Sequence, residues 1–121
     1  MEIEWNPHHI GLETLIRFSR SDKNKMYKYL FQFQELIPLR VIRLKESLED
    51  EDRKMIRQIL HQMSPQLQFF EILNVAEPIR RLEYEYETMP IEDLKSLVND
   101  ILIKLDRAIK EIGKVLKNNF E

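Results

Sequence analysis

The sequence has no cysteine, which excludes a disulfide framework and a thiolate metal site. It also has no uninterrupted apolar run of about eighteen residues, the length that a membrane-spanning helix requires. The first ten residues, MEIEWNPHHI, lack the basic and apolar regions of a secretion signal. We therefore expect a cytoplasmic protein that does not insert into a membrane.

Turn-forming residues are scarce as well, with two glycines and five prolines among 121 residues. Long stretches without a helix breaker predict a few long helices, and the length fits a single domain over residues 1–121. A basic excess is also missing, because the net charge is −2 and charges of both signs alternate along the chain. Nucleic-acid-binding proteins normally gather a basic excess on one face, so we expect no nucleic-acid partner.

Apolar residues recur at helical spacing through most of the sequence, and strand-like alternation is rare. The spacing predicts one short helix and four longer ones joined by brief loops. Their expected spans are about 12–18, 22–48, 51–70, 74–84 and 90–116. This pattern is typical of an all-α fold, an antiparallel four-helix bundle with a short additional N-terminal helix.

Polar residues at the expected helix starts predict how the helices are capped. Ser21 or Asp22 is expected to cap the second helix. The acidic cluster at 49–52 is expected to form a turn and the first turn of the third helix, where its charge meets the helix dipole. Asn74 followed by Glu77 has the spacing of a capping box at the start of the fourth helix.

Of the three histidines, only His61 lies within a strongly patterned helix. On a helical wheel its side chain points roughly 140–150° away from the apolar face. That face comprises Ile56, Ile59, Leu60, Met63, Leu67 and Phe70. A core histidine would have to lie on this face, so we expect His61 to face solvent or a partner.

The outer face around His61 carries cations and amides one or two turns away from it. These neighbours are Lys54, Arg57, Gln58, Pro65 and Gln68. Between Asp52 and Glu71 the chain has three basic residues and no acidic one. Such a surface can hold a phosphoryl group, whose negative charge is stabilised by cations and amide donors. We expect no carboxylate near the ring, and an acidic side chain pressed against it would undo this interpretation.

The chemistry of imidazole suits phosphoryl transfer. The group ordinarily titrates near pH 6.5, so its neutral, nucleophilic form dominates at about pH 7. It can attack an acyl phosphate and hold the phosphoryl group as a phosphoramidate that can be passed on. An exposed position on a rigid helix would present the ring to protein donors and acceptors.

Two segments resemble the histidine phosphotransfer (HPt) domains that are appended to hybrid two-component sensor kinases. The segment MIRQILHQM at 55–63, followed by Leu67, resembles the helix that bears the phosphorylated histidine. The segment AEPIRRLE at 76–83 resembles the following helix, which commonly ends in a leucine-glutamate pair. The order of the expected helices matches the family over roughly residues 8–117.

The sequence departs from the family pattern just after the histidine. The family commonly has lysine three positions and glycine four positions further on, where this chain has Ser64 and Pro65. Ser64 can donate a hydrogen bond but brings no charge, so Arg57 or Lys54 would have to supply the missing cation. Pro65 removes a helix hydrogen bond to the carbonyl of His61, and proline at this place resembles a variant among HPt domains of hybrid kinases.

The resemblance implies a phosphorelay carrier with no autonomous kinase activity. A receiver-domain aspartate would donate a phosphoryl group to Nε2 of His61, and a second receiver would accept it. Magnesium would be needed only on the receiver, and the carrier itself would need no cofactor. Receivers of this family dock on an apolar patch beside the histidine, for which Phe69 is a candidate. A histidine kinase in the same polypeptide would be a further partner, and the carrier itself would be a monomer.

Two other interpretations remain open at the level of sequence. One is a degenerate HPt or helical interaction module, in which Ser64 and Pro65 mark the loss of phosphotransfer. The other is a bundle that oligomerises through its long last helix. The adjacent His8 and His9 lack a carboxylate pair at ligand spacing, so we interpret them as loop residues and expect no metal site.

Overall fold

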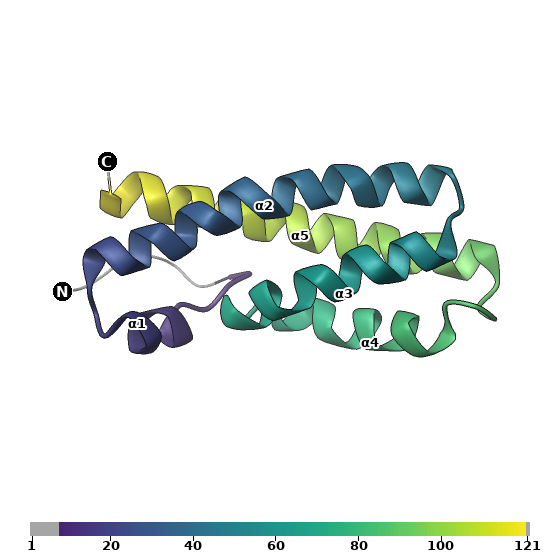
Figure 1. Cartoon of the computed structure of the whole chain (residues 1–121), viewed down its shortest axis with the longest axis horizontal. Helices are drawn as coiled ribbons and strands as arrows, with labels where there is room; N and C mark the ends of the chain where they lie inside the picture. Colours follow the sequence, from purple (N-terminus) through teal and green to yellow (C-terminus); the bar gives the residue numbers. More distant parts are fainter. Residues whose placement is uncertain (1–7, 121) are drawn as a thin grey trace.

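The structure, a computed structural model, describes residues 8–120, which form five α-helices, one 3-10 turn and no strand (Figure 1). The elements are α1 (Glu13–Ser19), α2 (Lys23–Glu49), α3 (Arg53–Phe69), η1 (Leu73–Val75), α4 (Ala76–Glu85) and α5 (Ile91–Phe120). The expected all-α fold is confirmed. None of the helices in this part of the chain is both long enough and apolar enough to cross a bilayer.

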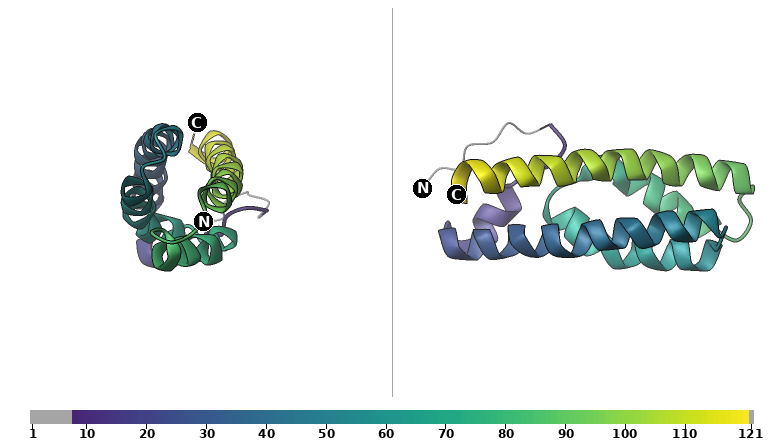
Figure 2. Two further views of the ribbon diagram at one scale, coloured as in Figure 1. Left: turned by 90° about the vertical axis from the view of Figure 1, so that its right-hand side faces the viewer. Right: turned by 90° about the horizontal axis from the view of Figure 1, so that it is seen from above.

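The four long helices α2 to α5 form the bundle, and each is antiparallel to the helix that precedes it (Figures 1 and 2). Contacts run from α2 to α3, from α3 to α4, from α4 to α5 and from α5 back to α2, so the helices close a ring around one core. Helix α1 packs against α2, beside the end of the bundle where α3 terminates. This arrangement is the bundle with an added N-terminal helix that the sequence predicts.

The core consists of the apolar stripes of the bundle helices. From α3 it takes Ile56, Ile59, Leu60, Met63 and Leu67, all of them buried. From α5 it takes Leu94, Val98, Ile101, Leu105, Ala108, Ile112 and Val115. Because residues three and four apart lie on one face of a helix, burying these stripes fixes which side of each helix faces outward. The outward side of α3 is the one that carries His61.

The helix caps agree with the sequence in part. The Asp22 side chain accepts hydrogen bonds from the amides of Asn24 and Lys25, which makes it the cap of α2. Asp52 caps α3 by accepting from the amide of Met55 at 3.0 Å. The acidic cluster therefore ends before the helix, and the expected acidic first turn of α3 is wrong.

The capping box expected at the start of the fourth helix is also wrong. Asn74 lies inside the 3-10 turn η1, and α4 begins after it with no side-chain cap at Val75. The main-chain carbonyl of Asn74 instead accepts from Nζ of Lys104 on α5, at 3.2 Å. The chain turns into α4 through η1, which places Asn74 one residue too early for the predicted box.

Two prolines lie in the interior of long helices that continue past them. Pro38 lies in α2, and Pro65 lies in α3, four residues after His61. Nη1 of Arg40, on α2, donates to the carbonyl of Gln62 at 3.0 Å and to the Gln66 side chain at 3.3 Å. This cation therefore ties α2 to the part of α3 whose hydrogen-bond ladder the proline interrupts.

The N-terminal segment is held on the bundle through its main chain. The carboxylate of Glu111, buried on α5, accepts from the amides of His8 and His9 at 3.0 and 2.9 Å. The amide of Gly11 donates to the carbonyl of Phe70, and the amide of Thr14 donates to the Glu71 carboxylate. Residues 8 to 14 thus run against the end of α3 and the side of α5.

Candidate functional site

His61 lies near the middle of α3 on its outward side, as the helical wheel predicts. Its side chain is 66% exposed. The preceding residue, Leu60, is fully buried, as is Met63 two positions later. The core side of α3 therefore anchors the backbone on both sides of the histidine. This anchoring holds the imidazole at the surface in a fixed place on the bundle.

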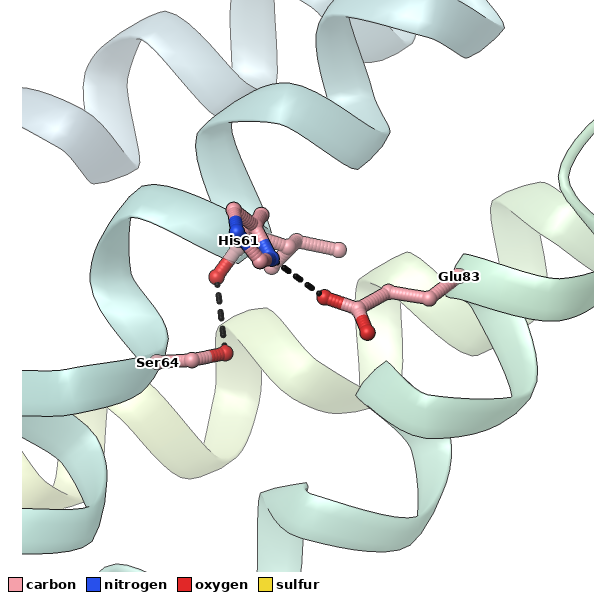
Figure 3. Close-up of polar contacts among 4 residues, drawn as sticks. His61, Ser64 and Glu83 are labelled. Carbon is pink, nitrogen blue, oxygen red and sulfur yellow. Dashed lines mark hydrogen bonds and ion pairs between the residues drawn. The ribbon is translucent and has the colours of Figure 1, made fainter.

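A carboxylate lies against the ring, contrary to the expectation from the sequence. Nδ1 of His61 is 3.0 Å from Oε1 of Glu83, which projects from α4 (Figure 3). The expectation of an acid-free surrounding was wrong because it considered only α3, whereas the acid comes from the neighbouring helix. It overturns the interpretation of an acid-free surface that attracts anions, so any function of His61 must be argued from the contact with Glu83 itself.

The contact also assigns chemical roles to the two ring nitrogens. An ionised carboxylate only accepts hydrogen bonds, so Nδ1 carries the proton that is shared with Glu83. The lone pair of the neutral ring is then on Nε2. Within residues 8–120 no side chain or main-chain group makes a hydrogen bond to Nε2, and the His61 side chain as a whole is 66% exposed. A carboxylate that holds the tautomer and the orientation of an imidazole in this way is a recurring device of nucleophilic sites.

The cations expected near His61 separate into two kinds. Lys54 is exposed on the outer side of α3, about two turns before the histidine, and makes no ion pair within the described residues. Arg57 is half-buried and turns toward α4, with its guanidinium 5.8 Å from the centre of the Tyr86 ring. Lys54 is therefore the cation on the outer side of α3 that has no ion-pair partner within the described residues, whereas Arg57 takes part in the contact between α3 and α4.

Ser64 and Pro65, the two departures from the HPt pattern, lie on the turn after His61. The Ser64 hydroxyl donates to the carbonyl of Leu60 at 3.1 Å, so its proton is used within the helix (Figure 3). Pro65 is exposed and adds no polar group to the surface. In this conformation neither residue supplies a donor toward the ring.

The two glutamines lie on opposite sides of His61 along α3. Gln58 is exposed, three residues before the histidine. Gln68 is exposed further on, at the edge of a groove of about 220 Å³ between α3 and α4 that also reaches Ser64 and Glu83. Of the two, Gln58 is nearer to the imidazole along the helix, and Gln68 belongs to the groove.

An aromatic cluster covers the junction of α1, α2 and the end of α3. The ring of Phe69 lies 5.8 Å from that of Phe18 and 5.2 Å from that of Tyr29. Phe18 is 68% exposed, so the cluster presents apolar surface to solvent. We call Phe18, Tyr29 and Phe69 the aromatic patch. It lies about two turns along α3 from His61.

The adjacent histidines near the N-terminus take no part in this site. His8 and His9 contact Glu111 through their main-chain amides, in the segment that precedes α1. Within residues 8–120 no three side chains of histidine, cysteine, aspartate or glutamate are grouped so as to hold a metal ion.

Glu83 is the site residue that reasoning from the sequence did not assign a role. The signal in the sequence was the leucine-glutamate pair of Leu82 and Glu83, at the end of the segment that resembles the HPt pattern. Its partner depends on how α4 lies along α3.

Neither a scan against models of protein families nor searches of curated proteins and of solved structures found a match for this chain.

Proposed function

We propose that this protein is a phosphorelay carrier that accepts a phosphoryl group on His61 from a receiver-domain aspartate and passes it to another receiver. The observation that carries the proposal is the exposed imidazole whose Nδ1 is held by Glu83, while Nε2 makes no hydrogen bond within residues 8–120. The likeness of the α3 and α4 segments to HPt domains supports the same function.

The transfer step follows from the two ring nitrogens. The Nε2 lone pair attacks the phosphorus of the aspartyl phosphate, a P–N bond forms, and the P–O bond to the aspartate breaks. The aspartate leaves as a carboxylate, and Nδ1 keeps its proton. The phosphorylated ring therefore gains a positive charge during the step. Transfer to the next receiver is the reverse reaction with a second aspartate.

Glu83 fits this step in spite of its negative charge. The charge that develops on the ring is shared by Nδ1, which lies 3.0 Å from the carboxylate. The phosphoryl group would be on the opposite side of the ring, so the carboxylate is closer to the charge that it stabilises than to the charge that it repels. We therefore assign Glu83 the role of orienting the imidazole and stabilising its cationic form.

The surroundings of His61 would supply the remaining interactions. Lys54 is the candidate cation for the phosphoryl oxygens, with Gln58 as an amide donor beside it. The aromatic patch is the candidate docking surface for the receiver, because aromatic side chains are enriched in protein interfaces and Phe18 of this patch is 68% exposed. The receiver would bring its own magnesium ion.

The proposal is tested by incubating the full chain with a panel of receiver domains charged with radiolabelled acetyl phosphate. We expect label on His61 that is lost in acid and stable in base. His61→Gln should abolish labelling and leave the helix content and the melting temperature nearly unchanged, since the side chain is 66% exposed. Labelling that persists in His61→Gln, or its absence from the wild type with every receiver, would refute the proposal.

The alternative is a helical interaction module without phosphotransfer. It is favoured by the two side chains that are turned away from the ring, namely the Ser64 hydroxyl and the Arg57 guanidinium. This alternative predicts that the wild type takes no label and binds a receiver with the same affinity as the His61→Gln variant. Binding and labelling measured on the same receiver distinguish the two functions.

A further inference from the structure

We infer that Arg53 is a positioning residue that sets the place of α4 along α3, and thereby the contact of Glu83 with His61. The inference rests on the proposed function for its kinetic test, and on the geometry of the two helices for its structural test. Arg53 is the first residue of α3 and is half-buried.

Helix α4 lacks the means to fix its own position. It has ten residues, no side-chain cap at its N-terminus and no basic residue in its last turn. A helix of this length is marginal by itself, and the carbonyls of its last turn need donors from elsewhere. What holds α4 in place must therefore come from its neighbours.

Arg53 supplies donors at the C-terminal end of α4. Its Nη1 donates to the carbonyl of Tyr86 at 2.9 Å and also to the carbonyl of Met89. Tyr86 is the C-cap of α4, and Met89 is buried in the turn that leads to α5. A guanidinium at this place neutralises the negative end of the helix dipole and fixes two main-chain atoms at once.

Helices α3 and α4 are antiparallel, so residues at the start of α3 lie beside the end of α4 (Figure 1). The contacts of Arg53 with the end of α4 therefore also set where Glu83 lies along α3. Along α3, Arg53, Arg57 and His61 follow one another at intervals of four residues, about one turn each. On α4 their partners run in the opposite direction: the first two contact Tyr86, and the third contacts Glu83, about one turn before it. A shift of α4 by one residue along α3 would take Glu83 away from the ring.

Arg53 has no direct part in the chemistry. It is eight residues before His61, about 12 Å along the helix axis. It acts through Glu83, so its removal cannot cost more in phosphoryl transfer than the removal of the Glu83 carboxylate.

The kinetic test is a double-mutant cycle on phosphoryl uptake by the full chain. We expect Glu83→Gln to slow uptake about 5- to 30-fold and Arg53→Met to slow it by up to the same factor. In the Glu83→Gln background, Arg53→Met should slow uptake by no more than about twofold further. Uptake by Arg53→Met at the wild-type rate, or losses that multiply in the double variant, would overturn the inference.

The structural test does not require phosphotransfer. Heteronuclear NMR of the imidazole nitrogens should show a proton on Nδ1 and none on Nε2 in the neutral wild type. Arg53→Met should populate both tautomers, as Glu83→Gln should. An unchanged tautomer in Arg53→Met would overturn the inference even if the wild type takes label. If the wild type takes no label, the proposed function fails, and this measurement still decides the role of Arg53.

Two further variants guard against a general loss of stability. Lys45→Met removes an exposed cation of α2 outside this cluster, and it should leave both readouts unchanged. Arg53→Lys keeps the charge and can reach one of the two carbonyls, so both readouts should lie between those of the wild type and Arg53→Met. A lysine variant no better than Arg53→Met, although folded, would contradict a role based on donation to the α4 carbonyls.

Discussion

The substitution Glu83→Gln tests the assignment of the His61 ring nitrogens most directly. It removes the charge and keeps the size of the side chain that lies 3.0 Å from Nδ1. The glutamine oxygen can still accept from Nδ1, but the amide group can also donate to it. Donation to Nδ1 would move the proton to Nε2 and occupy the nucleophilic lone pair.

The expected size of the effect follows from the exposure of the pair. A hydrogen bond to a charged group contributes about 1.5–3 kcal/mol when shielded from solvent. Here the two side chains are 66% and 30% exposed. We therefore take about 1–2 kcal/mol after solvent screening. Applied to the cationic ring that forms during transfer, this value slows phosphoryl uptake about 5- to 30-fold.

The assay is single-turnover uptake of label from one phosphorylated receiver, with the melting temperature as a control for folding. The melting temperature should shift little, because surface ion pairs contribute about 0–1 kcal/mol to stability. Faster uptake by Glu83→Gln would refute the reasoning. It would mean that the carboxylate acts mainly by repelling the incoming phosphoryl group.

Two further predictions concern stability and ionisation away from the site. Gly11→Ala should destabilise the protein by about 1–3 kcal/mol in chemical denaturation, because the added Cβ would lie 2.8 Å from Cδ of Glu71. The control Gly113→Ala, which meets only the flexible end of a glutamine side chain at 3.3 Å, should stabilise it by up to about 1 kcal/mol. Lys95→Met should raise the pKa of Glu51, measured by NMR, because a hydrogen bond from Lys95 and its positive charge hold that pKa below its usual range. A lowered pKa stabilises the fold above the ordinary glutamate range, so the stability difference from the wild type should disappear as the pH falls through the lowered pKa.

The helices were predictable from the sequence because each depends on a local pattern. The stripe of α5 and the wheel of α3 follow from apolar residues at helical spacing, and Asp22 is one of the two caps that the sequence allowed. The start of α4 was not predictable in the same way. Asn74 and Glu77 have the right spacing for a capping box, but the 3-10 turn before α4 uses Asn74 and leaves the box unformed.

The site was predictable only as far as a single helix determines it. The outward position of His61 follows from the burial of Leu60 and Met63, which the pattern of α3 shows. The contact with Glu83 depends on how two helices slide along each other, and the hydrogen bonds that fix this join residues 33 and 36 positions apart. The same contact surface turns Arg57 toward Tyr86, which no wheel of α3 alone could indicate.

The two hydrogen bonds that the Glu111 carboxylate accepts from the amides of residues 8 and 9 have a practical consequence for preparing shortened forms of this protein. Trimming the chain to begin at Ile10 would take away both amides that the Glu111 carboxylate binds. The buried carboxylate of Glu111 would then lack both hydrogen-bond donors, which typically lowers the stability of a fold by several kcal/mol. Expression of such a form should yield less folded material than one that starts a few residues earlier, with no change to the histidine on α3.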